Sequence, residues 1–400
     1  MCSVAFSDER RSFDFGVVPE GDLILCAGTP ESWQILRLPS DLGSTTALYR
    51  APASPSPPDA SFWTAVETAP EGTLVVVARN RGSDTSAQCH VTCLLLSHGS
   101  GSPVIVFDKT AVGNGDSVRL VRSMDNRLPL ICIRSQTGEL PSADARAVGT
   151  DMYVFSKRTA SYEHVGTYLF PADVLPLAHV WNGTSDKIWC MRRSSIEART
   201  DEEPDLTHAK GGRQRVEFGA APLSDPTAIT WDRTVRDLTG IAGHLPWWRL
   251  LPGRVEPVVG AMGWSPMQAC LATTMDSAAH DWQAQHLGRE ALSVGGTVYS
   301  SVTFVSLDTR ATDTAFLLVA ESVPHRTVID VYNCGKGPLE SIASLDYDAA
   351  LYDPTVRRAA TGGFYVAYLM TPHGPNRQLT GDVAELRPEC RLKLELWQSP

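Results

Sequence analysis

Apolar runs that each end in a polar or charged residue recur along the chain at intervals of about fifty residues. The clearest are "TLVVVAR" from Thr73, "PLICIRS" from Pro129, "KIWCMRR" from Lys187 and "AFLLVAE" from Ala315. A short run of this kind, bounded by turn residues, is typical of a strand buried on both faces. The repetition therefore constrains the fold more strongly than any other feature of the sequence, because the chain must pack the same kind of strand many times.

Each of these runs follows another strand-like segment across a short connector. Examples are "FWTAVET" with the connector "APEG" before "TLVVVAR", and "FDFGVV" with "PEGD" before "LILCAG". Connectors rich in Gly, Asn, Asp and Pro are typical of β-hairpins. In most repeats two further strand-like segments follow, such as "HVTCLLLS" and "PVIVFDK". A period of about fifty residues with four strands predicts an all-β protein of the β-propeller class.

The two ends of the sequence complement each other in this interpretation. The last repeat ends with "CRLKLELW" and lacks a fourth strand, whereas "CSVAFS" at the start has no partner of its own. Pairing the N-terminal strand with the last repeat removes an exposed edge. We therefore predict a propeller closed by its N-terminal strand, with seven blades and with six or eight as alternatives.

The blade length and the shared closing blade resemble WD40-like propellers. The resemblance extends over essentially the whole chain, but the Gly-His and Trp-Asp marks of that family are absent from their expected places. The tripeptide "TWD" at Thr230–Asp232 lies on a candidate fourth strand and is not such a mark. The resemblance implies a propeller that uses one loop face for binding.

We predict one propeller domain over residues 1–400, with an insertion at 195–255 between blades four and five. The first part of the insertion, "IEARTDEEPDLTHAKGGRQ", is polar and reads as an exposed loop. The second part, "LTGIAGHLPWWRLLPGR", is apolar and aromatic, which favours a short helix or a lid. Two stacked β-sandwich domains are the alternative architecture, but the regular spacing argues against them.

Composition narrows the classes of function. The formal net charge of -10 disfavours a nucleic-acid-binding protein. No apolar stretch approaches 18 residues and no secretory signal is evident, so we expect neither a membrane span nor export. The nine cysteines are scattered and mostly lie in apolar runs, which predicts reduced, buried thiols in a cytoplasmic protein.

Neither a metal nor a cofactor is expected. In "CHVTCLLL" the strand alternation places Cys89 and Cys93 on one face and His90 on the other, which favours a core position over a metal site. The chain lacks a nucleotide-binding glycine loop, a C-x-x-C pair, an H-E-x-x-H motif and a G-x-S-x-G motif.

The candidate binding residues lie where second strands end, because in propellers these ends meet on one face. Arg79, Arg134 and Arg192 end such strands, and an arginine fork binds carboxylates or phosphates with two hydrogen bonds. Ordinary solvated arginines are the simpler interpretation. The insertion supplies a second group, in which adjacent Trp and Arg side chains are common binding anchors; its members are His244, Trp247, Trp248 and Arg249.

A few residues are candidates for catalysis. His179, a candidate for catalysis, shares one face of the predicted first strand "LAHVWN" with Trp181, a candidate for binding, and a scaffold would usually have small apolar residues there. Asp276 and His280 would share a face if "MDSAAHDW" were helical, and could form an acid–base pair. His373 follows the last second strand.

Two main functions remain open at this stage, beside a third, that of a structural subunit in a larger assembly. The first is an interaction platform that binds a protein or peptide partner through its loop face, favoured because no catalytic motif is evident. The alternative is a small-molecule enzyme, such as a hydrolase, isomerase or cyclase, with a pocket at the mouth of the propeller channel. Polar groups converging around His179 and Trp181 would favour the enzyme, and a flat face would favour the platform.

Overall fold

The computed structural model of the 400-residue chain describes all the strands considered below. It covers residues 2–6, 12–56, 60–81, 88–98, 102–112, 118–123, 127–135, 147–171, 174–181, 186–195, 214–231, 236–238, 243–250, 257–265, 268–276, 281–286, 293–294, 297–298, 302–308, 316–323, 326–333, 340–360, 362–370 and 390–398. In these residues the regular structure is β-strand throughout. Nowhere in the described ranges is there a helix of the length and apolarity needed to cross a membrane.

The chain divides into two compact units. Unit 1 contains Met1–Pro171 and Tyr352–Pro400, and unit 2 contains Ala172–Leu351. Unit 1 thus combines both ends of the sequence.

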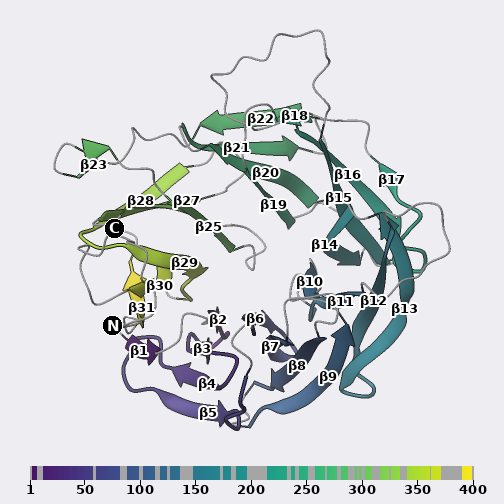
Figure 1. The fold of residues 1–400 in the computed structure, drawn as a ribbon, viewed down its shortest axis with the longest axis horizontal. Helices are drawn as coiled ribbons and strands as arrows, with labels where there is room; N and C mark the ends of the chain where they lie inside the picture. Colours follow the sequence, from purple (N-terminus) through teal and green to yellow (C-terminus); the bar gives the residue numbers. More distant parts are fainter. Residues whose placement is uncertain are drawn as a thin grey trace. The chain divides into compact units, whose positions relative to one another are not determined.

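Unit 1 is built from antiparallel meanders of four strands, and in the first three of them each strand pairs with the next one along the chain (Figure 1). The first sheet contains β2 (Ser12–Val17), β3 (Leu23–Gly28), β4 (Trp33–Leu38) and β5 (Thr46–Arg50). The second contains β6 (Phe62–Ala69), β7 (Gly72–Arg81), β8 (Gln88–Leu96) and β9 (Val104–Val112). The third contains β10 (Val118–Ser123), β11 (Leu130–Ser135), β12 (Ala147–Ser156) and β13 (Ser161–Pro171).

The last sheet of unit 1 joins the two ends of the sequence. It has the order β1-β31-β30-β29, formed by β1 (Cys2–Phe6), β31 (Cys390–Trp397), β30 (Phe364–Met370) and β29 (Leu351–Arg358). The β1–β31 ladder runs antiparallel from Cys2 opposite Leu394 to Phe6 opposite Cys390. The N-terminal strand therefore completes the last sheet, as the sequence predicts.

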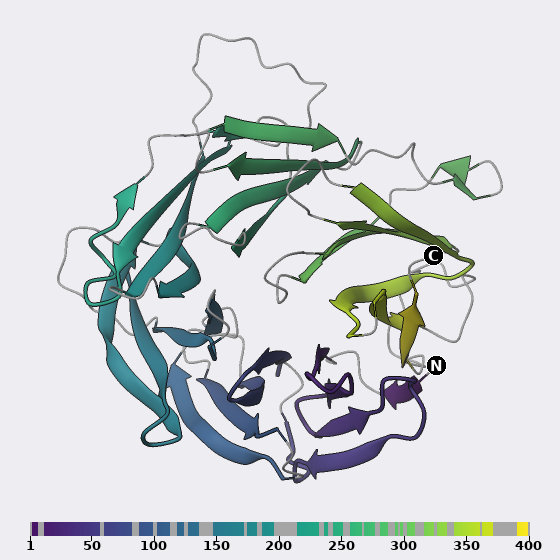
Figure 2. The ribbon, with the colours of Figure 1, turned by 180° about the vertical axis from the view of Figure 1, so that it is seen from behind.

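Unit 2 continues the same pattern (Figure 2). One sheet contains β14 (Val174–Trp181), β15 (Asp186–Ser195) and β16 (Gln214–Pro222), with short β17 (Thr230–Trp231) and β18 (Arg236–Leu238) both paired to β16. The next contains β19 (Gly243–Leu250), β20 (Pro257–Ser265), β21 (Gln268–Asp276) and β22 (Asp281–His286). A third contains β25 (Val302–Asp308), β26 (Phe316–Val323), β27 (Arg326–Asn333) and β28 (Glu340–Tyr347), and β23 (Ser293–Val294) pairs with β24 (Thr297–Val298).

Successive four-stranded meanders, with the N-terminal strand completing the last one, have the topology of a β-propeller. The predicted fold class is therefore confirmed, whereas the number of blades stays a prediction.

One segment differs from the sequence-based expectation. "GHLPWWRL" forms β19 and pairs along its whole length with β20, so the segment is a strand and not the short helix that was one of the two expectations. The expected first strand of the fifth repeat, "VVGAMG", is the second strand of its sheet, and "QACLATT" is the third. Strands β16 to β19 also lie inside the range 195–255 that was predicted to be an insertion. The sequence pattern did not predict this strand, because the tandem tryptophans after a proline show no apolar–polar alternation.

Unit 1 keeps its core between neighbouring sheets. One apolar cluster joins the first and last sheets, with Phe15 and Leu25 facing Tyr365 and Leu394. A second joins the first two sheets through side chains such as Ile35 and Val75. A third joins the second and third sheets. Both faces of a sheet are thus buried, which explains why second strands such as "TLVVVAR" are apolar without alternation.

The tight turn before "TLVVVAR" depends on a glycine. Gly72 has a φ of +143°, and a Cβ at this position would approach the carbonyl oxygen of Leu96 to 2.4 Å. The connector "APEG" therefore requires its glycine both for backbone conformation and for close strand approach.

Among the described residues, Cys26, Cys89, Cys93, Cys132 and Cys190 are buried and form no disulfide bond. Burial raises the pKa of Cys26 and of Cys132 to about 12, and that of Cys89 to about 11, from an ordinary value of 9.0. These thiols remain protonated at neutral pH, and the thiolate is the reactive form.

We predict that these five cysteines resist alkylation in the folded protein. At pH 8 with iodoacetamide, site-resolved mass spectrometry should find each of them unmodified, because burial shields all five thiols and the raised pKa of Cys26, Cys89, Cys93 and Cys132 also suppresses the thiolate. The same residues should be labelled fully in 8 M urea, which serves as the control. Rapid native labelling at any of the five would contradict the buried assignment.

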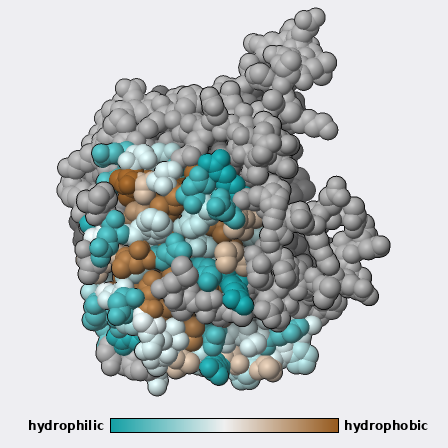
Figure 3. Space-filling model, turned by 90° about the vertical axis from the view of Figure 1, so that its left-hand side faces the viewer, coloured by the Kyte–Doolittle hydropathy of each residue, from teal (hydrophilic) through white to brown (hydrophobic). Residues whose placement is uncertain are grey.

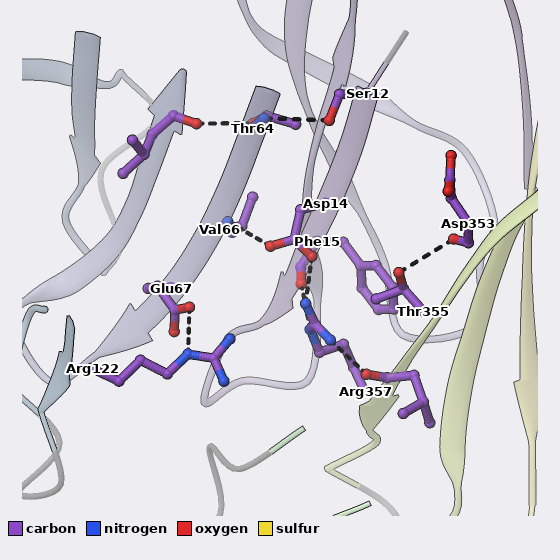
Figure 4. Close-up of polar contacts among 12 residues, drawn as sticks. Ser12, Asp14, Phe15, Thr64, Val66, Glu67, Arg122, Asp353, Thr355 and Arg357 are labelled. Carbon is purple, nitrogen blue, oxygen red and sulfur yellow. Dashed lines mark hydrogen bonds and ion pairs between the residues drawn. The ribbon is translucent and has the colours of Figure 1, made fainter. Parts of the chain in front are cut away.

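A buried ion pair ties together three sheets of unit 1 (Figure 4). Arg357 on β29 donates from Nη2 to Asp14 Oδ1 on β2, and Asp14 Oδ2 accepts the backbone N–H of Val66 on β6 at 2.8 Å. The remaining donors of Arg357 reach the carbonyl oxygens of Phe15, at 3.0 Å, and Val356, at 2.7 Å. The side chains of Arg357 and Asp14 are only 6% and 12% exposed. We call this group of contacts the clasp.

The clasp should be much more important for stability than an exposed pair in the same unit. We predict that Asp14→Ala lowers the free energy of unfolding by about 3–5 kcal/mol, because it leaves a buried guanidinium without its counter-charge. The control is Asp22→Ala, which breaks the Arg37–Asp22 pair, whose side chains are 41% and 27% exposed. The control should cost about 1 kcal/mol or less. Equal losses in urea denaturation would contradict this view of the clasp.

Candidate functional site

The first strands of the four sheets in unit 1 lie in a row with their starts at one end. The N–H of Thr64 donates to Ser12 Oγ, at 3.3 Å, and that of Val66 to Asp14, so β2 and β6 run in the same direction. Figure 4 shows Asp353, near the start of β29, on the same side of the clasp as Ser12. We call this side, where β29, β2, β6 and β10 begin and the second strands end, the entry end of unit 1.

Asp353 has an unusual backbone at the entry end. Its φ is +49°, in the left-handed region, although it precedes Pro354 and lies within β29. A residue before proline normally favours an extended backbone, and a left-handed non-glycine residue costs about 1–3 kcal/mol. Thr355 Oγ1 donates to the carbonyl oxygen of Asp353 at 3.4 Å, and the Asp353 residue is exposed. The chain thus maintains a strained conformation at a position where a carboxylate can meet solvent.

Two aromatic residues at the entry end remain partly exposed. Trp63, next to the first residue of β6, is 36% exposed, and Tyr352, beside Asp353, is 39% exposed. On the side of the molecule seen in Figure 3, brown apolar side chains are interspersed among teal polar ones in the described part. Aromatic surface next to charged groups is typical of small-ligand sites.

The other end of the same strands is fixed by a second ion pair. Arg122 Nε on β10 donates to Glu67 Oε1 on β6 at 2.8 Å, and the side chains are 28% and 9% exposed. Together with the clasp, this pair connects all four first strands by charged hydrogen bonds. The strands below the entry end are therefore rigidly held.

The predicted binding arginines occupy three different settings. Arg79 on β7 is half-buried and lies opposite Phe62 and His90. Arg134, at the end of β11, is half-buried in the third sheet. In unit 2, the guanidinium of Arg192 on β15 stacks on the ring of Trp231, with 4.6 Å from its carbon to the ring centroid. Arg79 and Arg134 share the entry end of unit 1, because both end second strands.

The predicted catalytic histidine of unit 2 is a buried residue. His179 on β14 is 3% exposed, and its Nε2 lies 3.1 Å from Asp186 Oδ1 at the start of β15. This contact joins the two strands near their turn. Trp181 ends β14, and Asp276 ends β21, where it lies opposite Asp281 in an antiparallel ladder.

The remaining predicted residues allow fewer statements. His280 and His373 lie outside the described residues. His244, Trp247, Trp248 and Arg249 are all part of β19, which fixes their strand position and register but not their side chains.

Sequence reasoning missed five residues that lie near the entry end on different strands: Trp63, Arg119, Thr150, Tyr352 and Asp353. The tripeptide "YDP" contained a signal, because Asp before Pro often marks an irregular backbone. "VRLVRS" contained another, since its two arginines are three residues apart and must lie on opposite faces of a strand. Thr150 has no sequence signal, because its position opposite Arg134 follows only from the β11–β12 register.

Comparisons with known proteins yield structural neighbours only. No family model and no curated protein matches the chain. A mutant of the Synechocystis apocarotenoid oxygenase has 13% identity and a TM-score of 0.44 over 84% of this chain and 71% of that one. The α-L-arabinofuranosidase Arb93A from Fusarium graminearum has 8% identity and a TM-score of 0.43, over 86% and 94%. The polysaccharide lyase Uly1 has 9% identity and a TM-score of 0.49, over 95% and 89%.

These neighbours correct one prediction from the sequence. An interaction platform was the first expectation, yet the structures that resemble the chain include an oxygenase, a glycosidase and a lyase, all of them enzymes. The platform interpretation is therefore wrong, and the comparisons agree better with the alternative. With TM-scores below 0.5 and identities of 8–13%, the likeness does not extend to a substrate or a reaction.

Proposed function

We propose that the protein is an enzyme that converts a small molecule at the entry end of unit 1, with Asp353 as the proton-transferring carboxylate. The reaction classes that fit are those that one carboxylate can assist by moving a proton, namely a hydrolase, isomerase or cyclase. The observation that carries the proposal is the exposed carboxylate of Asp353 on a strained, left-handed backbone.

Strain at this position supports a functional role over a structural one. A strained residue persists only when its surroundings fix it, and such residues cluster at active sites. The hydrogen bond from Thr355 fixes the carbonyl of Asp353, and the buried clasp fixes Arg357 four residues later on the same strand. A substrate-facing carboxylate would gain from this, because a preorganised catalytic group needs no reordering during the reaction.

The entry end supplies the other requirements of a small-molecule site. Tyr352 on β29 and Trp63 on β6 offer partly exposed aromatic surface there. Large aromatic side chains of this kind bind the apolar part of a ligand while a few polar groups orient it. The rigid strand row below keeps these side chains in place.

Activity should depend on the Asp353 carboxylate. In a panel of small esters, lactones, epimerisable acids and glycosides, monitored by mass spectrometry, the wild type should convert at least one compound. Asp353→Asn should lower kcat/KM for it by about 100-fold or more, because it removes the proton acceptor and keeps the shape. The control is Asp41→Asn, which alters a carboxylate that accepts the N–H of Gly43 in a turn. No conversion by the wild type, or full activity of Asp353→Asn, would overturn the proposal.

A matched pair of variants tests whether strain is stored at this position. Asp353→Gly and Asp353→Ala both remove the carboxylate, but only glycine adopts a φ of +49° without steric cost. We expect the glycine variant to be about 1 kcal/mol more stable than the alanine variant in urea denaturation, and both to be inactive. An alanine variant as stable as the glycine variant would show that the backbone stores no strain.

A further inference from the structure

Two strands of the second sheet in unit 1 present a small set of side chains at the entry end. Trp63, the second residue of β6, lies opposite Ala78 on β7. Asn80 is two residues beyond Ala78 on the same strand, and its backbone N–H donates to the carbonyl oxygen of Ser61 at 3.0 Å. Because opposite residues share a face and alternate residues return to it, Trp63, Asn80 and Ser61 project from one face of the sheet. We call these three residues the Trp63 cluster.

The side chains that β7 and β8 place next to the Trp63 cluster are small and uncharged. Ala78, and Cys89 opposite Asn80 on β8, are buried in the apolar core between the second and third sheets. Burial raises the pKa of Cys89 to about 11, so its thiol is neutral at physiological pH. Arg79 lies between Ala78 and Asn80 in the sequence but projects from the other face, opposite Phe62. The small side chain of Ala78 therefore separates the indole ring from the amide.

Asn80 has a side-chain atom without a partner. The residue is 7% exposed, and its Nδ2 donates to Ser61 Oγ at 2.7 Å. Within the described part of the chain, Asn80 Oδ1 has no hydrogen-bond partner. Turning the amide over would pair the oxygen with Ser61 and leave the nitrogen without a partner instead, so one polar atom is unsatisfied in either orientation. Native proteins rarely keep such an atom unless a ligand or a water satisfies it.

The indole ring of Trp63 supplies the apolar part of the cluster. Trp63 is 36% exposed, whereas Ala65 and Ala69 on the same face of β6 are buried. An exposed tryptophan by itself needs no explanation. An exposed ring beside a buried amide with an unsatisfied atom does, because an apolar surface with a few directed polar contacts is what small-molecule sites consist of.

The chemistry of the Trp63 cluster matches a hydroxylated ring. A hydroxyl both donates and accepts, so it can satisfy Asn80 in either orientation and can accept the proton of the exposed Ser61. Diagonal neighbours such as Trp63 and Asn80 lie about 7–8 Å apart, which lets one ring contact the indole while its hydroxyl reaches the amide. A carboxylate or an ammonium group would find no counter-charge in the cluster, and burying an unpaired charge is costly.

We propose that Trp63, Asn80 and Ser61 form a subsite for a neutral ring that carries several hydroxyl groups, which is the chemistry of a sugar ring. The C–H bonds on one side of such a ring pack against the indole, whose face is partly negative and attracts them. Trp63 and Asp353 are the second and third residues of their strands, so the subsite lies at the same end of unit 1 as the proposed catalytic carboxylate. The assignment of the ring to the substrate of Asp353 rests on the proposed function, whereas binding of the ring does not.

Saturation-transfer NMR with neutral methyl glycosides tests the subsite directly. The probes are the methyl glycosides of glucose, galactose, mannose, xylose and rhamnose, and the wild type should bind at least one of them saturably. Trp63→Ala should weaken that binding by about 10-fold or more, while Trp63→Tyr, which keeps an aromatic face, should retain it within about 3-fold.

The control for Trp63→Ala is Ile105→Ala, which removes a 55% exposed apolar side chain from β9 of the same sheet and should leave the affinity unchanged. Absence of saturable binding to every probe, or equal affinity of Trp63→Ala and the wild type, would overturn the proposal.

A variant of Asn80 separates a binding role from a structural one. Asn80→Leu keeps the volume and removes the unsatisfied atom, so we expect stability in urea equal to or above that of the wild type and binding about 10-fold weaker. Water replaces the bond that Ser61 loses, because Ser61 is exposed. A structural role would give lower stability with unchanged affinity, and that result would exclude Asn80 from the subsite.

Two ligand comparisons test the chemistry of the ring. Cyclohexanol has a similar ring but one hydroxyl, and it should bind at least about 5-fold more weakly than the best methyl glycoside, because a site built for hydroxyls rejects ligands that lack them. Methyl glucuronide carries a carboxylate and should bind no more tightly than methyl glucoside. Equal binding of cyclohexanol would show a merely apolar contact, and tighter binding of the glucuronide would show an anion site. Either result would contradict the assignment to a neutral sugar ring.

Kinetics and binding together separate this proposal from the proposed function. For a converted compound that carries the ring, Trp63→Ala should raise KM by about 10-fold with kcat almost unchanged, because the subsite binds substrate and transition state alike. An unchanged KM would show that the ring is not part of the substrate. Asp353→Asn should bind the glycoside as tightly as the wild type. A protein that binds glycosides but converts no compound would contradict only the assignment of Asp353, and one that converts compounds but binds no glycoside would contradict only the subsite.

Discussion

The buried contact between Arg357 and Asp14 is the interaction on which the arrangement of unit 1 depends. It connects the end of the sequence to its beginning, because β29 belongs to the last sheet and β2 to the first. The second oxygen of Asp14 continues the connection to the backbone of Val66 in the second sheet. All three guanidinium nitrogens of Arg357 and both carboxylate oxygens of Asp14 are hydrogen-bonded, which is the condition under which a buried charge can be tolerated.

The clasp and the entry end have different roles on the same strands. Toward one end the strands are joined by charged hydrogen bonds and packed by apolar side chains. At the other end the chain keeps features that stability alone would remove, namely the left-handed backbone of Asp353, the exposed ring of Trp63 and the unsatisfied hydroxyl of Thr150. Proteins retain such costly features where a ligand or a reaction compensates for them. The position of Asp353 at the entry end is the reason for placing the proposed function there.

How much could be predicted depended on which signal each segment carried. "TLVVVAR", "LICIRS" and "FYVAYLM" were correctly predicted as second strands, since each combines a buried apolar run with a hairpin turn. In the sheet of β19 to β22 the predicted strand order was wrong by one position. The segment "VVGAMG" has the small apolar residues of a first strand, and "GHLPWWRL" was not recognised as a strand. The hydrophobic pattern identifies a strand but does not give its position within a sheet, because that position depends on which strands pair with one another.

The sequence by itself determined the class of fold, the repeating meander and the pairing of the first strand with the last. These features follow from local sequence patterns, which show the apolar strands that must be buried and the strand edge that must be protected. Only the tertiary structure decided which polar residues meet. Asp14 and Arg357 are 343 positions apart, and Thr150 faces Arg134 through a register that no local pattern encodes. Side-chain partnerships across sheets depend on how separate segments pack in space, so the candidate site became visible only when the strands were placed side by side.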